Sequence, residues 1–146
     1  MFKYKSVNYI WYWGPVYFYA ALIFYLSSQS RLPGCVSFFP NQDKVMHFFE
    51  YGIFCFLIVR AQVFSPYKKI SSKAIFVNAI LFSSTFGIFD EIHQYFVESR
   101  EMSFSDFLAD FLGGIFIVII LSKTRYISNA QKRRNSEENR EPKISN

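Results

Sequence analysis

The chain alternates long apolar runs with short polar segments. The runs cover Tyr9–Leu26, Val45–Val63, Ala74–Phe96 and Phe104–Leu121. Each is about 18–23 residues long, which is the length that a helix needs to cross the hydrocarbon core of a bilayer. A soluble helical bundle would show polar residues with a period of 3.6, and these runs show almost none. The pattern therefore predicts an all-α membrane protein, a bundle of four transmembrane helices.

The first run has a second interpretation, because Lys3 and Lys5 precede it as they would in a signal peptide. Its apolar part is too long for that role, and its start, YIWYWGPVYFY, suits a belt of aromatic residues at a membrane interface. We interpret it as an uncleaved helix. Pro15 then falls in the first turns of this helix, where a missing N–H costs little.

Composition supports one membrane domain followed by a polar tail. Nineteen Phe and ten Tyr are far more than a soluble core of a 146-residue chain needs. We expect residues 1–122 to form the four-helix transmembrane domain. Residues 123–146 are polar and charged, and we expect this tail to be disordered.

The distribution of Lys and Arg predicts the orientation in the membrane. Thirteen of the sixteen lie before the first run, between the last turn of the second run and the start of the third, or after the fourth. The positive-inside rule then places both termini in the cytoplasm of a multi-pass cell-membrane protein. The basic stretch QKRRN could also suggest a nucleic-acid patch, but short basic segments beside a membrane usually meet anionic lipid. We therefore expect membrane lipid as a partner and no nucleic acid.

Carboxylates show the opposite distribution and cluster at the predicted outer face. They are concentrated in the segment FDEIHQYFVESREMSFSDFLADFLGG, Phe89–Gly114. Asp43 and His47 are four residues apart, as are Asp106 and Asp110, so each pair shares one face of a helix. Charged groups inside a bilayer usually face the bundle interior and are paired or protonated. The spacing therefore predicts one polar pocket, formed by three helices just below the outer surface.

The same residues resemble the VanZ-like family of membrane proteins. The segment DKVMHFFEY is similar to the family's Asp-Lys-x-x-His-x-x-x-Tyr motif. The segment from Asp90 to Gly113 is similar to three further family elements in order: Asp-Glu-x-x-Gln, then Arg, then Asp-x-x-x-(Asn or Asp)-x-x-Gly. The chain departs from the family at Glu98-Ser99, where Pro-Gly is common, and at Ile117, where a small residue is common. The family is named for a glycopeptide (teicoplanin) resistance protein. The resemblance therefore implies a role in the cell envelope and a connection with antibiotic resistance.

Three functions of the pocket stay open from the sequence. It is a site that binds or acts on a lipid-linked or peptidoglycan-related ligand, an ion-paired scaffold without catalysis, or a small proton- or ion-coupled transporter that would need to form an oligomer. No nucleophile motif, Gly-rich phosphate loop or paired zinc-ligand motif is present, so enzymatic activity is undecided. The candidate site residues are Asp43, Lys44, His47, Asp90, Glu91, Gln94, Arg100, Asp106 and Asp110.

Each of these side-chain types has a chemical role in such a site. Oxygen ligands suit a divalent cation such as Mg²⁺ or Ca²⁺, which would bridge a phosphate. His47 would act as a general base, and Lys44 and Arg100 would bind anionic oxygens. The candidate metal ligands are Asp90, Glu91, Asp106 and Asp110.

Overall fold

A computed structural model describes the chain over residues 2–29, 41–64, 70–98 and 100–138. This part of the chain is entirely helical apart from short turns and connections, which confirms the predicted all-α class. Its helices are α1 (Phe2–Ser27), α2 (Gln42–Phe64), α3 (Ser72–Tyr95), α4 (Phe104–Lys123) and α5 (Tyr126–Glu138).

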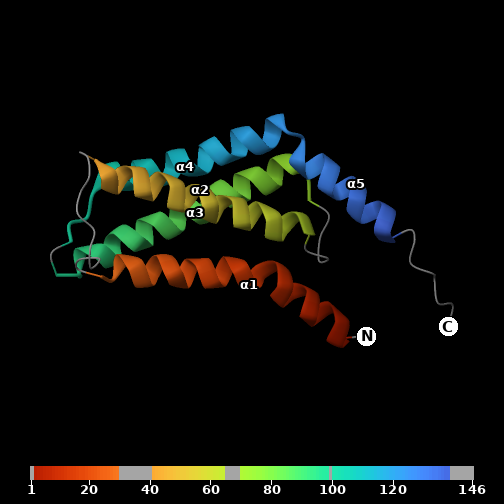
Figure 1. Cartoon of the computed structure of the whole chain (residues 1–146), viewed down its shortest axis with the longest axis horizontal. Coiled ribbons are helices and arrows are strands. Elements are labelled where there is room, and N and C mark those ends of the chain that lie inside the picture. The colour runs from red at the N-terminus through yellow and green to blue at the C-terminus, as the bar shows by residue number, and fades with distance from the viewer. Residues whose placement is uncertain (1, 30–40, 65–69, 99, 139–146) are drawn as a thin grey trace.

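The centre of the fold is the pair formed by α2 and α4. These two helices run in the same direction and make the most extensive contact of the fold, and α3 packs antiparallel against both (Figure 1). α1 lies mainly along α2. The starts of α2 and α4 and the end of α3 therefore meet at one end of the bundle, which is where the sequence placed the polar pocket.

Glycines allow the backbones of α2 and α4 to approach closely. A Cβ at Gly113 would clash with the carbonyl oxygen of Phe48 and would lie 3.2 Å from the backbone nitrogen of Gly52. Ile117 packs against Gly52, where a Cβ would lie 3.3 Å from Ile117 Cγ1. The small residue on α2 thus makes room for Ile117, so this departure from the family pattern does not open the helix contact. Small residues at helix contacts are typical of membrane bundles.

The lateral surface of the bundle, which runs along the helices, is apolar and suited to contact with lipid. α2, α3 and α4 are each long and apolar enough to cross a membrane. Large apolar side chains point outward along them, for example Phe49, Leu81 and Phe82, which are 59%, 59% and 68% exposed. A soluble protein rarely leaves such a surface uncovered.

The N-terminal helix differs from the other three. α1 is not among the helices that are apolar enough to span, because its many Tyr and Trp residues lower its hydropathy. The expected fourth span thus remains a prediction. α1 also begins at Phe2, so Pro15 lies inside the helix and not in its first turns. An internal proline removes a backbone hydrogen bond, which accounts for the bend of α1 in Figure 1.

The expected disorder of residues 123–146 is wrong for the segment that forms α5. Two of its side chains, Ile127 and Ala130, are buried at 2% and 6% exposure. They belong to the hydrophobic core, and Tyr126 packs against it. α5 contacts α2 and α4, and burial of these apolar groups holds an otherwise polar helix in place. Residues 139–146 lie outside the described part of the chain.

Candidate functional site

The structure brings all nine candidate site residues to the same end of the bundle. α2 contributes three of them, α3 three and α4 two, and the remaining one, Arg100, follows α3. Most are inaccessible to solvent, and Asp90, Glu91, Asp106 and Asp110 are each 4% exposed or less. Ionisable groups buried among apolar helices require partners, so the contacts of each one define the site.

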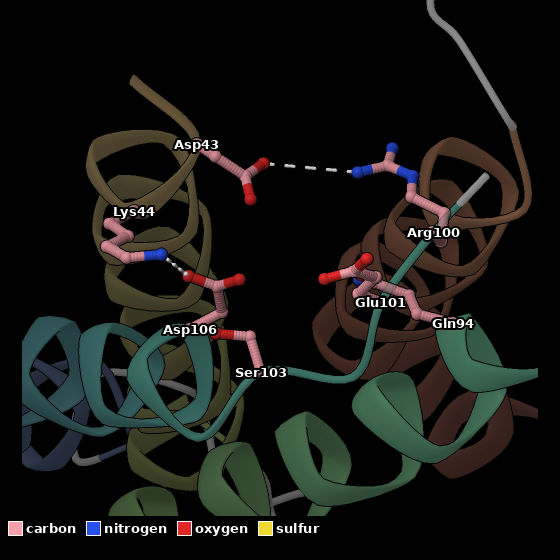
Figure 2. A pocket seen from close by; sticks show the side chains of 7 residues that line it. All are labelled: Asp43, Lys44, Gln94, Arg100, Glu101, Ser103 and Asp106. Atoms are coloured by element: carbon pink, nitrogen blue, oxygen red, sulfur yellow. Dashed lines mark hydrogen bonds and ion pairs between the residues drawn. The ribbon is translucent and has the colours of Figure 1, made fainter. Parts of the chain in front are cut away.

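A polar cavity opens at this end (Figure 2). Its volume is about 420 Å³, which falls within the range of small-molecule binding sites. It is lined by Asp43, Lys44, Gln94, Arg100, Glu101, Ser103 and Asp106. Five of these carry charge, so the cavity is suited to an ionic group and not to an apolar ligand.

Two ion pairs connect α2 to α4. Lys44 Nζ lies 2.7 Å from Asp106 Oδ1 beside the cavity. Approximately one turn deeper, His47 Nδ1 lies 2.9 Å from Asp110 Oδ1. The second pair is almost fully buried, with 7% and 0% of the two side chains exposed. The predicted faces of the two helices therefore do meet, and they pair in parallel register.

Arg100 is held less tightly than the two cations on α2. Its Nη1 lies 3.9 Å from Asp43 Oδ1 across the cavity, which is the limit of an ion pair (Figure 2). Its Nε donates to the carbonyl oxygen of Gln29, just after α1, at 3.2 Å. This contact fixes the base of the guanidinium while its terminal nitrogens face the cavity.

The acidic residues of α3 are each bonded through one oxygen. Gln94 Nε2 donates to Asp90 Oδ2 at 3.0 Å, and the backbone N–H of Ser103 donates to Glu91 Oε2 at 2.7 Å. The other oxygens, Asp90 Oδ1 and Glu91 Oε1, are buried and have no hydrogen-bond partner in the described part of the chain. The same is true of Asp110 Oδ2 and of the Tyr51 hydroxyl. Such atoms are uncommon in native structures and call for an explanation.

Two groups of side chains have the composition and spacing of a metal site within the described residues. One is Asp43, His47 and Asp106, and the other is His47, Glu91 and Asp110. In each group the three ligand atoms lie within 4.8 Å of one another. Three of the four predicted carboxylate ligands thus fall in these groups, whereas Asp90 belongs to neither. His47, which was not among the predicted metal ligands, belongs to both.

Several neighbours of the site were missed in the sequence. Glu101 and Ser103 line the cavity, and the Oγ of Ser28, just after α1, lies 2.9 Å from His93 Nε2 of α3. Gly87 leaves space for a carboxylate, since a Cβ there would lie 2.8 Å from Asp110 Oδ2. Gly87 precedes Asp90 and Glu91 by three and four residues, so helical spacing would have placed it on the same face.

Comparisons with known proteins identify the family but not the ligand. None of the curated proteins and none of the solved structures compared with the chain gave a significant match. The family pattern described as VanZ/LLP1 matches residues 12–126. The match extends from α1 to the start of α5 and includes every candidate site residue, so the chain belongs to the VanZ/LLP1 family.

Proposed function

We propose that this protein is a multi-pass membrane protein that binds the anionic head group of a membrane lipid or lipid-linked envelope precursor. The head group occupies the polar cavity at the extracytoplasmic end of the bundle. The membrane-like surface of α2 to α4 and the family assignment support the membrane location. The cavity size and its charged lining support binding of a polar head group.

The single observation that carries the proposal is the position of Arg100. Its guanidinium faces the cavity and is only weakly paired with Asp43, at 3.9 Å. Guanidinium groups bind phosphate or carboxylate oxygens through two parallel hydrogen bonds. Lys44 is already bonded to Asp106, so Arg100 is the cation best able to bind the ligand. Asp43 and Glu101 also line the cavity, and they would accept an ammonium group of a zwitterionic ligand.

The charge distribution supports the proposed extracytoplasmic position of the cavity. Arg60, Lys73 and Lys123 lie at the ends of α2, α3 and α4 that are remote from the cavity. The start of α1 and the end of α5 also lie on that side of the bundle (Figure 1). By the positive-inside rule, this end of the bundle would face the cytoplasm, which supports an extracytoplasmic position for the cavity.

An ion-paired scaffold is the second candidate function. The buried His47–Asp110 pair and the Lys44–Asp106 pair join α2 to α4, and removing one partner of a buried pair is strongly destabilising. These pairs can therefore serve assembly alone. Arg100 distinguishes the two functions, because its ion pair with the exposed Asp43, at 3.9 Å, is too long to contribute much to the fold.

The test compares Arg100→Gln with Lys123→Gln, which removes the same charge at the opposite end of the bundle. The full chain is purified in detergent, and its binding of phosphatidylglycerol and of a polyprenyl phosphate is measured by native mass spectrometry. We expect Arg100→Gln to weaken binding of one of these lipids at least tenfold with an unchanged unfolding temperature, and Lys123→Gln to bind normally. Equal binding by wild type and Arg100→Gln, or equal losses in both variants, would contradict the proposal.

A further inference from the structure

Below the cavity lies a cluster of buried side chains of the kinds that bind metal ions, and some of its carboxylate oxygens have no partner in the ion pairs described above. It consists of His47 from α2, Glu91 from α3 and Asp110 from α4, and all three are buried. One ligand atom from each lies within 4.8 Å of those of the other two. The cluster holds two carboxylates and one imidazole among apolar helices, and a bound cation would balance the charge of the carboxylates.

We propose that His47, Glu91 and Asp110 bind one divalent transition-metal ion, of which Zn²⁺ is the best representative. Metal–nitrogen and metal–oxygen bonds are about 2.0–2.2 Å long, so two adjacent ligands of one ion lie about 3 Å apart. His47 Nδ1 and Asp110 Oδ1 are 2.9 Å apart. The imidazole favours a transition metal over Mg²⁺ or Ca²⁺, which prefer all-oxygen sites.

The unpartnered oxygens of the cluster are the independent observation that points to a ligand. Glu91 Oε1 and Asp110 Oδ2 are buried and lack a hydrogen-bond partner in the described part of the chain. Their residues are 4% and 1% exposed. A carboxylate oxygen in that position loses its hydration without replacement, and a bound cation supplies the missing interaction.

The surroundings also resemble the outer shell of a metal site. The backbone N–H of Ser103 donates to Glu91 Oε2 at 2.7 Å, which orients the carboxylate. Gly87 leaves the space that Asp110 occupies, since a Cβ would lie 2.8 Å from Asp110 Oδ2 and 3.3 Å from Tyr51 Cε1. The Tyr51 hydroxyl is also buried and has no hydrogen-bond partner in the described part of the chain.

The cavity above provides an access path for the ion. Asp106 and Gln94 line the cavity, and Asp110 and Glu91 lie about one turn deeper on the same two helices. Three protein ligands leave a position for water or a ligand oxygen, as in catalytic zinc sites. The inference does not depend on the proposed head-group binding, because the metal site is defined by buried residues that do not line the cavity.

The other group with suitable spacing, Asp43, His47 and Asp106, is the less suitable site. Asp43 is exposed, and the carboxylates of Asp43 and Asp106 each already face a cation. Asp106 Oδ1 is bonded to Lys44, and Asp43 Oδ1 lies 3.9 Å from Arg100. This group therefore has less need of a metal ion than the buried group. A substitution of Asp43 distinguishes the two sites, because Asp43 belongs only to the exposed one.

The experiment measures metal binding by the full chain, purified in detergent with any affinity tag removed and with metal stripped by chelator. Zn²⁺, Mn²⁺ and Mg²⁺ are each titrated alone by calorimetry. We expect one Zn²⁺ per chain, bound at least tenfold more tightly than Mg²⁺. Glu91→Gln and Asp110→Asn should weaken Zn²⁺ binding at least tenfold, whereas Glu101→Gln and Asp43→Asn, which change exposed carboxylates near the cavity, should leave it within twofold.

A second measurement needs no variant and so does not depend on the folding of any substituted chain. Co²⁺ added to the stripped wild-type protein should give visible absorption different from that of the aqueous ion, and Zn²⁺ should displace it. An unchanged aqueous spectrum would overturn the proposal. So would Zn²⁺ binding unaffected by Glu91→Gln and Asp110→Asn, a loss in Asp43→Asn equal to theirs, or a preference for Mg²⁺.

Discussion

At the scale of single residues, the stability of this end of the bundle depends on which buried charges have partners. Asp110 is 1% exposed, and its Oδ1 lies 2.9 Å from His47 Nδ1. If His47 is removed in the metal-free protein, both carboxylate oxygens of Asp110 are buried without a described partner. If both residues are removed, no charge is left to be satisfied. The changes in the free energy of unfolding caused by the two single substitutions should therefore not add up to the change caused by the double substitution.

We predict that His47→Leu destabilises the metal-free protein by about 1–3 kcal/mol, the cost of leaving a buried polar group unsatisfied. The double variant His47→Leu/Asp110→Leu should recover at least half of that loss, because two apolar side chains replace the pair. Chemical unfolding in detergent, monitored by circular dichroism, measures both values. Glu101→Gln, at an exposed carboxylate, is the control and should change stability little. Additive losses in the double variant would show that the two residues do not interact.

At the scale of helices, the close contact between α2 and α4 determines whether the site residues meet. The Lys44–Asp106 and His47–Asp110 pairs both require these helices to lie near each other and in register. Gly113 permits this distance, because its α-hydrogens face the backbone of Phe48 and Gly52. A side chain at this position would push the helices apart and lengthen both ion pairs.

We predict that Gly113→Ala destabilises the bundle by about 1–3 kcal/mol, the range for overpacking. The added methyl would clash with a backbone carbonyl, which cannot rotate away as a side chain can. Gly14→Ala is the matched control, since its Cβ would meet only Ile10 Cγ2, at 4.0 Å. That substitution should be neutral or stabilising, because alanine favours helix more than glycine does. Unfolding temperatures of the two variants in one detergent provide the comparison, and equal values would contradict the proposed packing.

Helical spacing predicted which polar side chains lie together but did not predict α5, and particular residues explain both outcomes. Asp43 with His47, and Asp106 with Asp110, could be placed on helix faces because the period of a helix is fixed. Their pairing across α2 and α4 depends on Gly52 and Gly113, and the sequence indicated only the second of these. α5 was missed because Ile127 and Ala130 are too few to produce a periodic pattern, and their burial depends on the surfaces of α2 and α4.

At the scale of the whole molecule, charge and apolar surface together define an axis. Most carboxylates of the described residues and the cavity lie at one end of the bundle, and Arg60, Lys123 and the basic residues of α5 lie at the other. Between the ends, α2, α3 and α4 expose apolar side chains over lengths that match a bilayer. We expect a molecule with this asymmetry to have one preferred orientation in a membrane, which the positive-inside rule predicts.

We predict that the cavity faces the outside of the cell and α5 faces the cytoplasm. In a background with Cys35→Ser and Cys55→Ala, single cysteines replace Glu101 beside the cavity and Lys132 on α5, both of which are exposed. A membrane-impermeant thiol reagent added to intact cells should label position 101 and should label position 132 only after permeabilisation. The charge asymmetry is the physical reason, since moving the basic end across the membrane would separate it from anionic cytoplasmic lipid. Labelling of position 132 in intact cells, with position 101 protected, would show the opposite orientation. It would then exclude an extracytoplasmic ligand for the cavity.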